Sequence, residues 1–294
     1  MDRQLIRPET IDQALSEREK YGRDALPIAG GQSLLVLLRN KLIDPKVLID
    51  LQTLHKLHGM KAQESGLSIG AMTTIHALAS SSDVQTKALI LAQAASKVGS
   101  TAIRNLGTIG GNLCHNEPGA DLPPALLALN ATVELRSRKA TRKVPLNEFF
   151  RNYFETVVAA EELLCKVDVP KLPERASGAY LKHAISAEDL AIVGVAALVV
   201  PHETKAGAAH EVRIALGGVS PVPFRAIKAE SVLKGESLRN EIIREAAEVA
   251  ASEAEPMTDP HASADYRRKM VKVLVRRAIA EAIGRLERDS NGKA

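Results

Sequence analysis

The chain has 294 residues, of which 45% are hydrophobic and 25% charged, and its net charge is +4. This composition is ordinary for a globular protein, and the length allows about two domains at roughly 100–200 residues each. Four tyrosines, four phenylalanines and no tryptophan offer few rings for stacking bases, so we expect no nucleic-acid partner.

Two features of the sequence bear on location. The first ten residues contain no apolar signal core, and the longest apolar run, Leu190 to Val200, is too short to span a bilayer. The two cysteines, Cys114 and Cys165, fit a reducing compartment without disulfides. We therefore expect a cytoplasmic protein with no membrane span.

The N-terminal part of the chain has the pattern of a short β-α-β-α-β unit. Thr10 can cap its first helix, and a glycine-rich turn precedes its second. Because the unit is short, it predicts a small lobe rather than a complete dinucleotide-binding domain. The expected elements are strand 4–6, helix 11–20, strand 25–28, helix 34–42 and strand 47–51.

The turn in this unit is a candidate phosphate site. It lies between a strand and the start of a helix, where backbone N–H groups and the positive end of the helix dipole point at a bound anion. Its sequence is neither a P-loop nor a GxGxxG motif, so neither of those mechanisms applies. Its residues are Ala29, Gly30, Gly31, Gln32 and Ser33.

The pattern of strands and helices restarts at Gly66 and continues to Pro170. Alternating apolar residues predict the strands, and a run rich in Ala and Leu predicts the main helix. The expected elements are strand 67–71, a short helix ending at Leu78, helix 84–98, and strands 132–136 and 163–169.

A second glycine segment lies within this region and consists of Thr108, Ile109, Gly110, Gly111 and Asn112. We expect its glycines to form a tight turn whose N–H groups, with those of the first loop, hold a pyrophosphate from two sides. A plain glycine turn is the alternative. Asp121, ahead of an apolar run, is suited either to capping a helix or to accepting hydrogen bonds from sugar hydroxyls.

A domain boundary is expected at residues 170–174, where prolines and charges interrupt the pattern. Beyond it strand-like runs come first and helical patterns follow, which is typical of a separate α+β domain. The expected strands are 179–185, 190–200 and 212–217, and the expected helices are 226–233, 240–251 and 263–286.

Six stretches of the chain, in this order, resemble the FAD-binding medium subunits of molybdenum hydroxylases, typified by carbon monoxide dehydrogenase and xanthine dehydrogenase. The similarity covers essentially the whole length. The stretches are AGGQSLL at 29–35, TIGGN at 108–112, GADLPPALLAL at 119–129, EELLCKVDVP at 161–170, YLKHAISAEDLAIVGVAAL at 180–198 and ASADYRRKMVKVLVRRAI at 262–279.

The resemblance implies an α+β fold. Residues 1–173 would form a two-lobed FAD-binding domain of the PCMH/VAO type, with lobes of about 1–57 and 58–173. Residues 174–294 would form a C-terminal domain made of a three-stranded antiparallel sheet and a helical bundle.

The resemblance also implies how FAD is held, without a covalent bond. Both glycine segments would contact its pyrophosphate, and Asp121 would meet the ribityl or ribose hydroxyls. Leu164 would provide a backbone contact near the ring, and Lys182 would reach the flavin across the domain interface and stabilise its reduced form. An exposed strand lysine is the alternative for Lys182. Some members carry an aromatic beside the ring where this chain has Leu190.

The implied function is electron relay from [2Fe-2S] clusters of a small partner subunit, through FAD, to an external acceptor. A molybdenum cofactor would lie on a large partner subunit, in a dimer of heterotrimers. With two cysteines the chain cannot ligate a cluster of its own, and we predict neither a catalytic residue nor a metal site within it. The alternatives are a self-sufficient flavoenzyme, like the cell-wall enolpyruvyl-sugar reductases, and a non-redox nucleotide-binding module.

Two other groups of residues are less informative. Cys114 and His115 have no nearby ligands that complete a zinc set, so they are interpreted as structural. The basic residues of 263–286 alternate with apolar ones, which indicates an amphipathic helix with a solvated face. A docking face for a partner subunit is the alternative.

Overall fold

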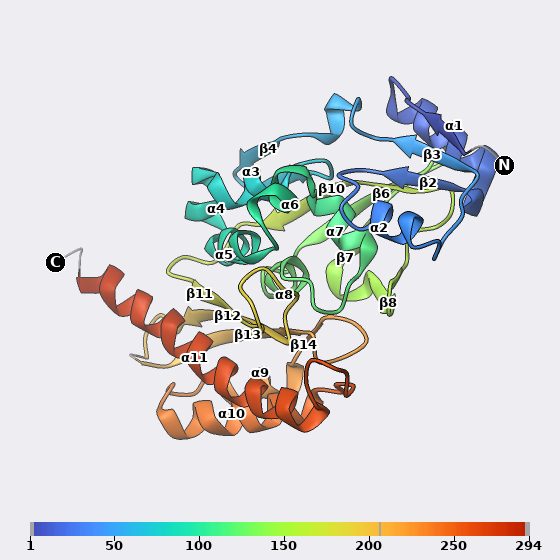
Figure 1. Ribbon diagram of the computed structural model, residues 1–294. Coiled ribbons are helices and arrows are strands. Elements are labelled where there is room, and N and C mark those ends of the chain that lie inside the picture. Colours follow the sequence, from blue (N-terminus) through green and yellow to red (C-terminus); the bar gives the residue numbers. More distant parts are fainter. Residues whose placement is uncertain (1–2, 206, 292–294) are drawn as a thin grey trace.

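The first lobe is built from three short parallel strands. The computed structural model describes residues 3–205 and 207–291, and in it the strands lie in the order β1 (Gln4–Ile6), β3 (Val47–Asp50), β2 (Ala25–Ile28). Helix α1 (Ile11–Tyr21) connects β1 to β2, and helix α2 (Leu34–Arg39) connects β2 to β3 (Figure 1). The predicted β-α-β-α-β unit is therefore confirmed.

Local sequence explains the start and packing of α1. The Thr10 hydroxyl accepts a hydrogen bond from the Gln13 N–H, and the Gln13 side chain accepts one from the Thr10 N–H. This reciprocal capping box satisfies N–H groups that a helix start leaves open. The apolar face of α1 buries Ala14 and Leu15 against the sheet, where Ile49 is fully buried.

The second lobe contains a five-stranded antiparallel sheet and several short helices. Its strand order is β4 (Met60–Gln63), β5 (Gly66–Gly70), β10 (Leu163–Pro170), β6 (Thr132–Arg136), β7 (Thr141–Pro145). A small hairpin pairs β8 (Phe150–Asn152) with β9 (Glu155–Thr156). The helices are α3 (Ile75–Ser80), α4 (Ser82–Lys87), α5 (Leu89–Lys97), α6 (Thr101–Leu106), α7 (Ile109–His115) and α8 (Leu122–Ala128).

The helix predicted over residues 84–98 is in fact two helices. Ala88 separates α4 from α5 with φ −149° and ψ 52°, which is outside the helical region. Ser81 caps α4 by accepting a hydrogen bond from the Val84 N–H. Val84, Ala88, Leu91 and Ala95 are all buried and are spaced as on one face of a single helix, so periodicity alone does not reveal the break.

The C-terminal region forms a four-stranded antiparallel sheet backed by three helices. The strands, in order, are β11 (Ser177–His183), β12 (Val193–Pro201), β13 (Ala209–Gly217) and β14 (Phe224–Arg225). The expected three-stranded sheet therefore has a fourth, two-residue edge strand, which is too short to give an alternating pattern. The helices are α9 (Ile227–Leu233), α10 (Asn240–Glu253) and α11 (Ala264–Asn291).

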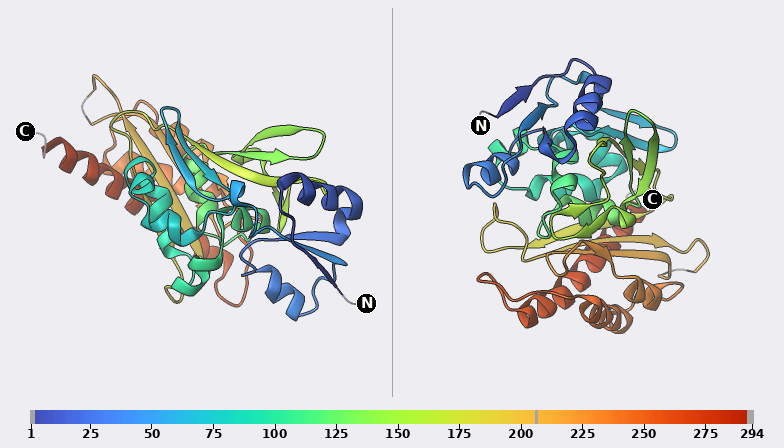
Figure 2. Two further views of the ribbon diagram at one scale, coloured as in Figure 1. Left: turned by 90° about the horizontal axis from the view of Figure 1, so that it is seen from above. Right: turned by 90° about the vertical axis from the view of Figure 1, so that its right-hand side faces the viewer.

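Strand β12 is buried on both faces. Ala196, Leu198 and Val200 pack into the core of the second lobe, whereas Val195 and Val199 pack against the C-terminal helices. Alternate residues of a strand point to opposite faces, so one continuous apolar run supplies both cores. Figure 2 shows this sheet between the second lobe and the orange and red helices. No helix in the described part of the chain is long and apolar enough to cross a membrane.

Because the two cores share β12, we predict that they unfold together. Leu198→Ala removes a side chain that is 1% exposed and should lower the free energy of unfolding by about 2–5 kcal/mol. Urea unfolding followed by circular dichroism should show one transition at a lower midpoint. The control Leu42→Ala, at a side chain 68% exposed, should change stability by no more than about 0.5 kcal/mol. Two separate transitions in Leu198→Ala would contradict the shared core.

Candidate functional site

The loop from Ala29 to Ser33 presents free backbone donors between β2 and α2. Within the described residues, nothing accepts a hydrogen bond from the N–H groups of Gly30, Gly31, Gln32 or Ser33. Gly31 has φ +70°, a conformation that favours glycine, and the Gln32 side chain folds back to donate to the Gly30 carbonyl at 2.9 Å. The loop therefore leaves four consecutive N–H groups without a protein acceptor, and their role in holding a phosphate stays a prediction.

The second glycine segment is the first turn of helix α7 and not a loop. Thr108 caps the helix, because its hydroxyl oxygen accepts a hydrogen bond from the Gly111 N–H at 3.1 Å. The Asn112 N–H donates to the Thr108 carbonyl at 2.9 Å. Neither Gly110 nor Gly111 has positive φ. The expectation of a tight turn lined by open N–H groups is therefore wrong at this segment.

The glycines of α7 instead allow a close approach to the neighbouring chain. The Gly110 N–H donates to the Ala71 carbonyl at 2.9 Å, and the Ile109 N–H donates to the Thr73 carbonyl at 3.0 Å. A Cβ at Gly110 would lie 2.8 Å from the Ala71 oxygen, nearer than real Cβ contacts come. Close packing thus explains why glycine stands here although it is a poor helix former.

The two glycine segments lie against each other in the structure. A Cβ at Gly30 would overlap the carbonyl oxygen of Leu106, two residues before the second segment. A Cβ at Gly111 would lie 3.7 Å from the Cβ of Ala29. The open N–H groups of the first loop therefore lie beside the start of α7, so the predicted neighbourhood of the two segments is confirmed.

Asn112 adds an unsatisfied acceptor in the first turn of α7. Its Oδ1 atom is buried and has no hydrogen-bond partner among the described residues. A buried carbonyl oxygen without a partner costs free energy, so such an atom calls for a donor. Together with the open N–H groups it fits a ligand that combines phosphate oxygens with hydroxyl groups, as FAD does.

Asp121 lies in a separate polar cluster between the second lobe and the C-terminal sheet. Its side chain is buried, its Oδ1 accepts a hydrogen bond from the Tyr180 hydroxyl at 2.7 Å, and its Oδ2 accepts one from Lys182 Nζ at 3.0 Å. Asp121 occupies the N-cap position of α8 but makes no capping hydrogen bond. Lys182 Nζ also donates to the carbonyl of Lys97 at the end of α5, at 2.9 Å.

The environment of Lys182 excludes one of the two positions that were predicted for its side chain. Its side chain is only 5% exposed, so the alternative of an exposed strand lysine is wrong. Tyr180 was missed by the sequence analysis, although Tyr180 and Lys182 are two residues apart on one strand and so share a face. That spacing is the signal that could have paired them.

Burial is the largest cause of the pKa shifts of Asp121 and Tyr180 in this cluster. It raises the pKa of Asp121 from its ordinary 3.8 to about 6, against the opposing charge of Lys182, the hydrogen bonds from Tyr180 and Lys182, and the charge of Lys97. Burial also raises the pKa of Tyr180, and the neighbouring carboxylate adds to the shift. Tyr180 is therefore a neutral hydrogen-bond donor at physiological pH.

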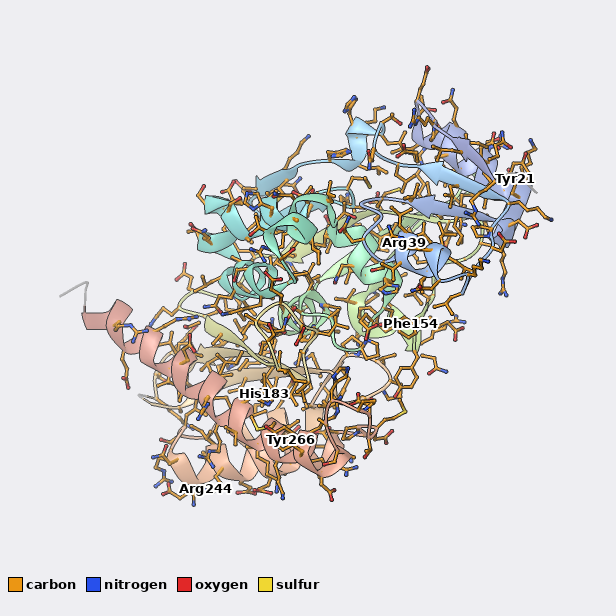
Figure 3. All side chains as sticks on the ribbon, viewed as in Figure 1. Tyr21, Arg39, Phe154, His183, Arg244 and Tyr266 are labelled. Atoms are coloured by element: carbon orange, nitrogen blue, oxygen red, sulfur yellow. The ribbon has the colours of Figure 1, made fainter. Side chains whose placement is uncertain are left out.

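Leu164 and Leu190 have contrasting positions. Leu164 is buried in β10, next to a bulge in its pairing with β6. Leu190 is 56% exposed and lies against Gly119, where a Cβ would be 3.2 Å from the leucine Cβ. Nearby, His183 and the Tyr266 hydroxyl share a hydrogen bond of 2.9 Å (Figure 3).

The remaining candidates do not form a second site. Burial raises the pKa of the Cys114 thiol on α7 to about 12 and that of Cys165 to about 11, so both thiols are protonated at neutral pH. The His115 ring lies against the Phe154 ring, with centroids 5.3 Å apart. No group of three or more His, Cys, Asp and Glu side chains within the described residues is arranged to hold a metal.

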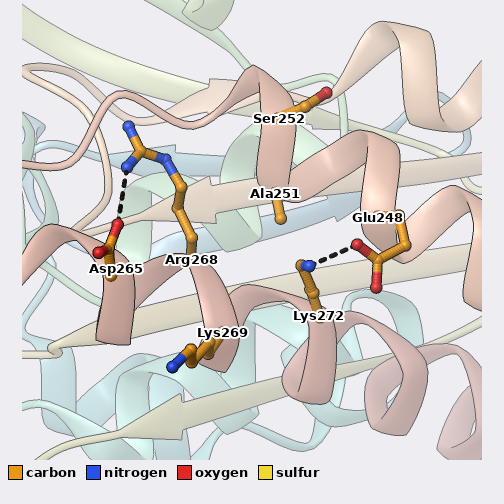
Figure 4. Close-up of a pocket in the computed structure, with 7 residues that line it drawn as sticks. All are labelled: Glu248, Ala251, Ser252, Asp265, Arg268, Lys269 and Lys272. Carbon is orange, nitrogen blue, oxygen red and sulfur yellow. Dashed lines mark ion pairs between the residues drawn. The ribbon is translucent and has the colours of Figure 1, made fainter.

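A pocket of about 380 Å³ lies between α10 and α11 (Figure 4). Lys272 of α11 forms an ion pair with Glu248 of α10 across it, and Arg268 pairs with Asp265 of its own helix. These helices cover the face of the C-terminal sheet that is turned away from the second lobe (Figure 1).

The side chains of Val271 and Leu274 on α11 face the core, whereas Lys269, Arg276 and Arg277 are exposed. The predicted amphipathic helix with a solvated face is therefore confirmed, except that Arg267 is buried and donates to the carbonyls of Ile192 and Gly218.

The contact between the two glycine segments predicts different tolerance at two glycines. Gly30→Ala would force a methyl group into the Leu106 carbonyl and should cost about 1–3 kcal/mol of stability in urea unfolding. Gly111→Ala is the matched control, because its Cβ would meet no backbone atom, only the Thr108 hydroxyl at 3.0 Å and the Ala29 Cβ at 3.7 Å, and alanine favours a helix by about 1 kcal/mol. Equal stability of the two variants would contradict the close approach.

The buried carboxylate predicts a specific pH dependence of stability in the chain without ligand. Between pH 3.8 and about 6 the native state keeps a proton on Asp121 that the unfolded chain has lost, so this group's contribution to stability falls as pH rises. The free energy of unfolding of the wild type minus that of Asp121→Asn should therefore be larger at pH 4 than at pH 7. A difference that stays constant or grows with pH would contradict this.

Two family models match this chain and together cover most of its length. Residues 1–172 match the family model described as the FAD binding domain in molybdopterin dehydrogenase. Residues 178–282 match the model described as the CO dehydrogenase flavoprotein C-terminal domain. Both models match in the order that the resemblance predicts.

Relatives and solved structures give the same answer. The chain is 34% identical to the glyceraldehyde dehydrogenase medium chain of Sulfolobus acidocaldarius, over 94% of this chain and 96% of that one. It is 33% identical to the carbon monoxide dehydrogenase medium chain of Hydrogenophaga pseudoflava, over 95% and 96%. A solved structure of carbon monoxide dehydrogenase from that organism superposes with a TM-score of 0.93 at 32% identity, covering 97% of this chain and 98% of that one. The chain therefore belongs to the FAD-binding medium subunits of the molybdenum hydroxylases, which are components of oxidoreductases.

Proposed function

We propose that this chain relays electrons within a molybdenum-containing hydroxylase or dehydrogenase. It takes them from [2Fe-2S] clusters of a small partner subunit, holds them on FAD, and passes them to an external acceptor. The observation that carries the proposal is the row of open N–H groups at Gly30 to Ser33, set against α7 in a chain that matches the family throughout.

The residues of the loop, of α7 and of the polar cluster suit a noncovalently bound FAD. The loop of Ala29 to Ser33 would hold the pyrophosphate through its N–H groups, because such clusters favour phosphate oxygens. Asn112 would accept a hydrogen bond from the cofactor with its unpaired Oδ1, and Lys182 would lie near the ring. When bound, FAD supplies the capacity to accept electrons and release them again.

The partner subunits follow from what the chain contains. Relatives such as the carbon monoxide dehydrogenase medium chain are named as one chain of several. Four thiolates are needed for an iron–sulfur cluster, and this chain has two cysteines, one of them buried in β10. We therefore assign the clusters to a small subunit and the molybdenum cofactor to a large one, in a cytoplasmic dimer of heterotrimers.

The relay model predicts which reagents can reduce the flavin of the isolated chain. Purified chain loaded with FAD should be bleached by dithionite under anaerobic conditions and reoxidised by an artificial acceptor. A purine, an N-heterocycle, an aldehyde or carbon monoxide should leave the flavin absorbance unchanged until the partner subunits are added. The reason is that the substrate reacts at a cofactor on another chain.

Two outcomes would contradict the proposal in different ways. A preparation that is colourless and does not bind added FAD would exclude a flavin role altogether. Bleaching by one of these substrates without partners would favour a self-sufficient flavoenzyme. Release of an unmodified flavin by acid or heat serves as the control that the cofactor is FAD and is held without a covalent bond.

A further inference from the structure

The polar atoms of Asp121 are engaged within the protein. One carboxylate oxygen accepts from the Tyr180 hydroxyl at 2.7 Å and the other from Lys182 Nζ at 3.0 Å. The side chains of Asp121 and Lys182 are 3% and 5% exposed. A carboxylate so enclosed is placed to balance the neighbouring ammonium, and it has little surface left for the hydroxyls of a sugar.

Tyr180 is fixed in place by contacts of its backbone, its ring and its hydroxyl group. Its backbone N–H donates to the Gln93 side chain at 2.9 Å, and its ring lies over Gly194, where a Cβ would be 2.7 Å from the hydroxyl. Glycine at 194 therefore leaves room for the hydroxyl to reach Asp121. The tyrosine fixes one oxygen of the carboxylate and so leaves the other facing Lys182.

A chain of contacts connects this cluster to the phosphate loop. Lys182 donates to the carbonyl of Lys97, and the two carbonyls that follow accept from Arg104 of α6, at 2.9 and 2.7 Å. Helix α6 ends at Leu106, whose carbonyl lies against Gly30. The cluster and the loop thus border the same segment, residues 97–107, from its two ends.

We propose that Asp121 acts on the bound flavin as the counter-ion of Lys182, and that Tyr180 is the positioning residue that holds this carboxylate against the lysine. The inference rests on the proposed FAD site. Lys182 uses two of its three N–H donors inside the protein, so it presents one donor and a compensated charge to a ligand. Without the Asp121 carboxylate, the positive charge of Lys182 would act on the flavin uncompensated. Without Lys182, a buried negative carboxylate would remain.

The charges predict a set of shifts in the reduction potential of bound FAD, measured by equilibration with redox dyes at pH 8. Asp121→Asn should raise the ratio of reduced to oxidised flavin about tenfold at a fixed solution potential, a shift of about 30 mV for a two-electron couple. A bare cation near the ring favours the reduced, anionic form. Lys182→Met should shift the ratio the other way.

Two further variants separate charge from damage to the fold. The double variant Asp121→Asn with Lys182→Met removes both charges and should return to within about threefold of the wild-type ratio, because the opposite effects of a contacting pair cancel.

Tyr180→Phe should change the ratio of reduced to oxidised flavin in the same direction as Asp121→Asn, but by less. This change should become larger as the pH falls towards 6. The charged groups facing the carboxylate in that range are Lys182 on β11 and Lys97 on α5. Tyr21→Phe in the first lobe (Figure 3) is the matched control and should change nothing.

Each contrary result has its own meaning. If Asp121→Asn weakens FAD binding tenfold or more and leaves the potential unchanged, Asp121 is a sugar ligand and the counter-ion role falls, while the FAD site stands. If Tyr180→Phe matches the wild type at every pH, the positioning role falls. If the double variant lies further from the wild type than both single variants, the two charges do not compensate each other. If the wild type binds no FAD, the proposed function falls together with this inference.

Discussion

The packing of the molecule depends on the sheet of β11 to β14, because both faces of this sheet are buried. Its central strand sends Leu198 towards the second lobe and Val199 towards the C-terminal helices. Burial of a large aliphatic side chain stabilises a fold by about 1.5–3 kcal/mol, and here both faces of one strand contribute. The packing of two regions is thus coupled by a single apolar run.

The polar cluster of Asp121, Tyr180 and Lys182 is a consequence of that sheet. Strand β11 packs against α5, and its tyrosine and lysine reach the aspartate at the start of α8. In such an enclosed place an ion pair is costly to form and costly to break, since loss of one partner leaves a charge without solvent, at about 3–5 kcal/mol. A cluster of this kind holds its geometry, which suits a role beside a cofactor.

Sequence reasoning was accurate where the signal is local. The strand, glycine turn and helix around Gly30 lie as periodicity and turn chemistry predict, and both family models match the predicted stretches. It was wrong about Gly110, because helix propensity disfavours two adjacent glycines and only the tertiary contact with Ala71 accounts for them. It missed the bond between Asp121 and Tyr180 because 59 residues separate them. The roles assigned to Leu164 and Lys182 towards FAD stay predictions.

The contact between Gly30 and Leu106 bears on how such chains can vary. What meets the glycine is a backbone oxygen, while the leucine side chain is 55% exposed. Nearly any residue supplies the same carbonyl, so position 106 is open to substitution as long as the helix before it ends in place. Position 30 accepts no side chain at all. Distant members of the family should therefore carry different residues at the position of Leu106 and keep glycine at the position of Gly30.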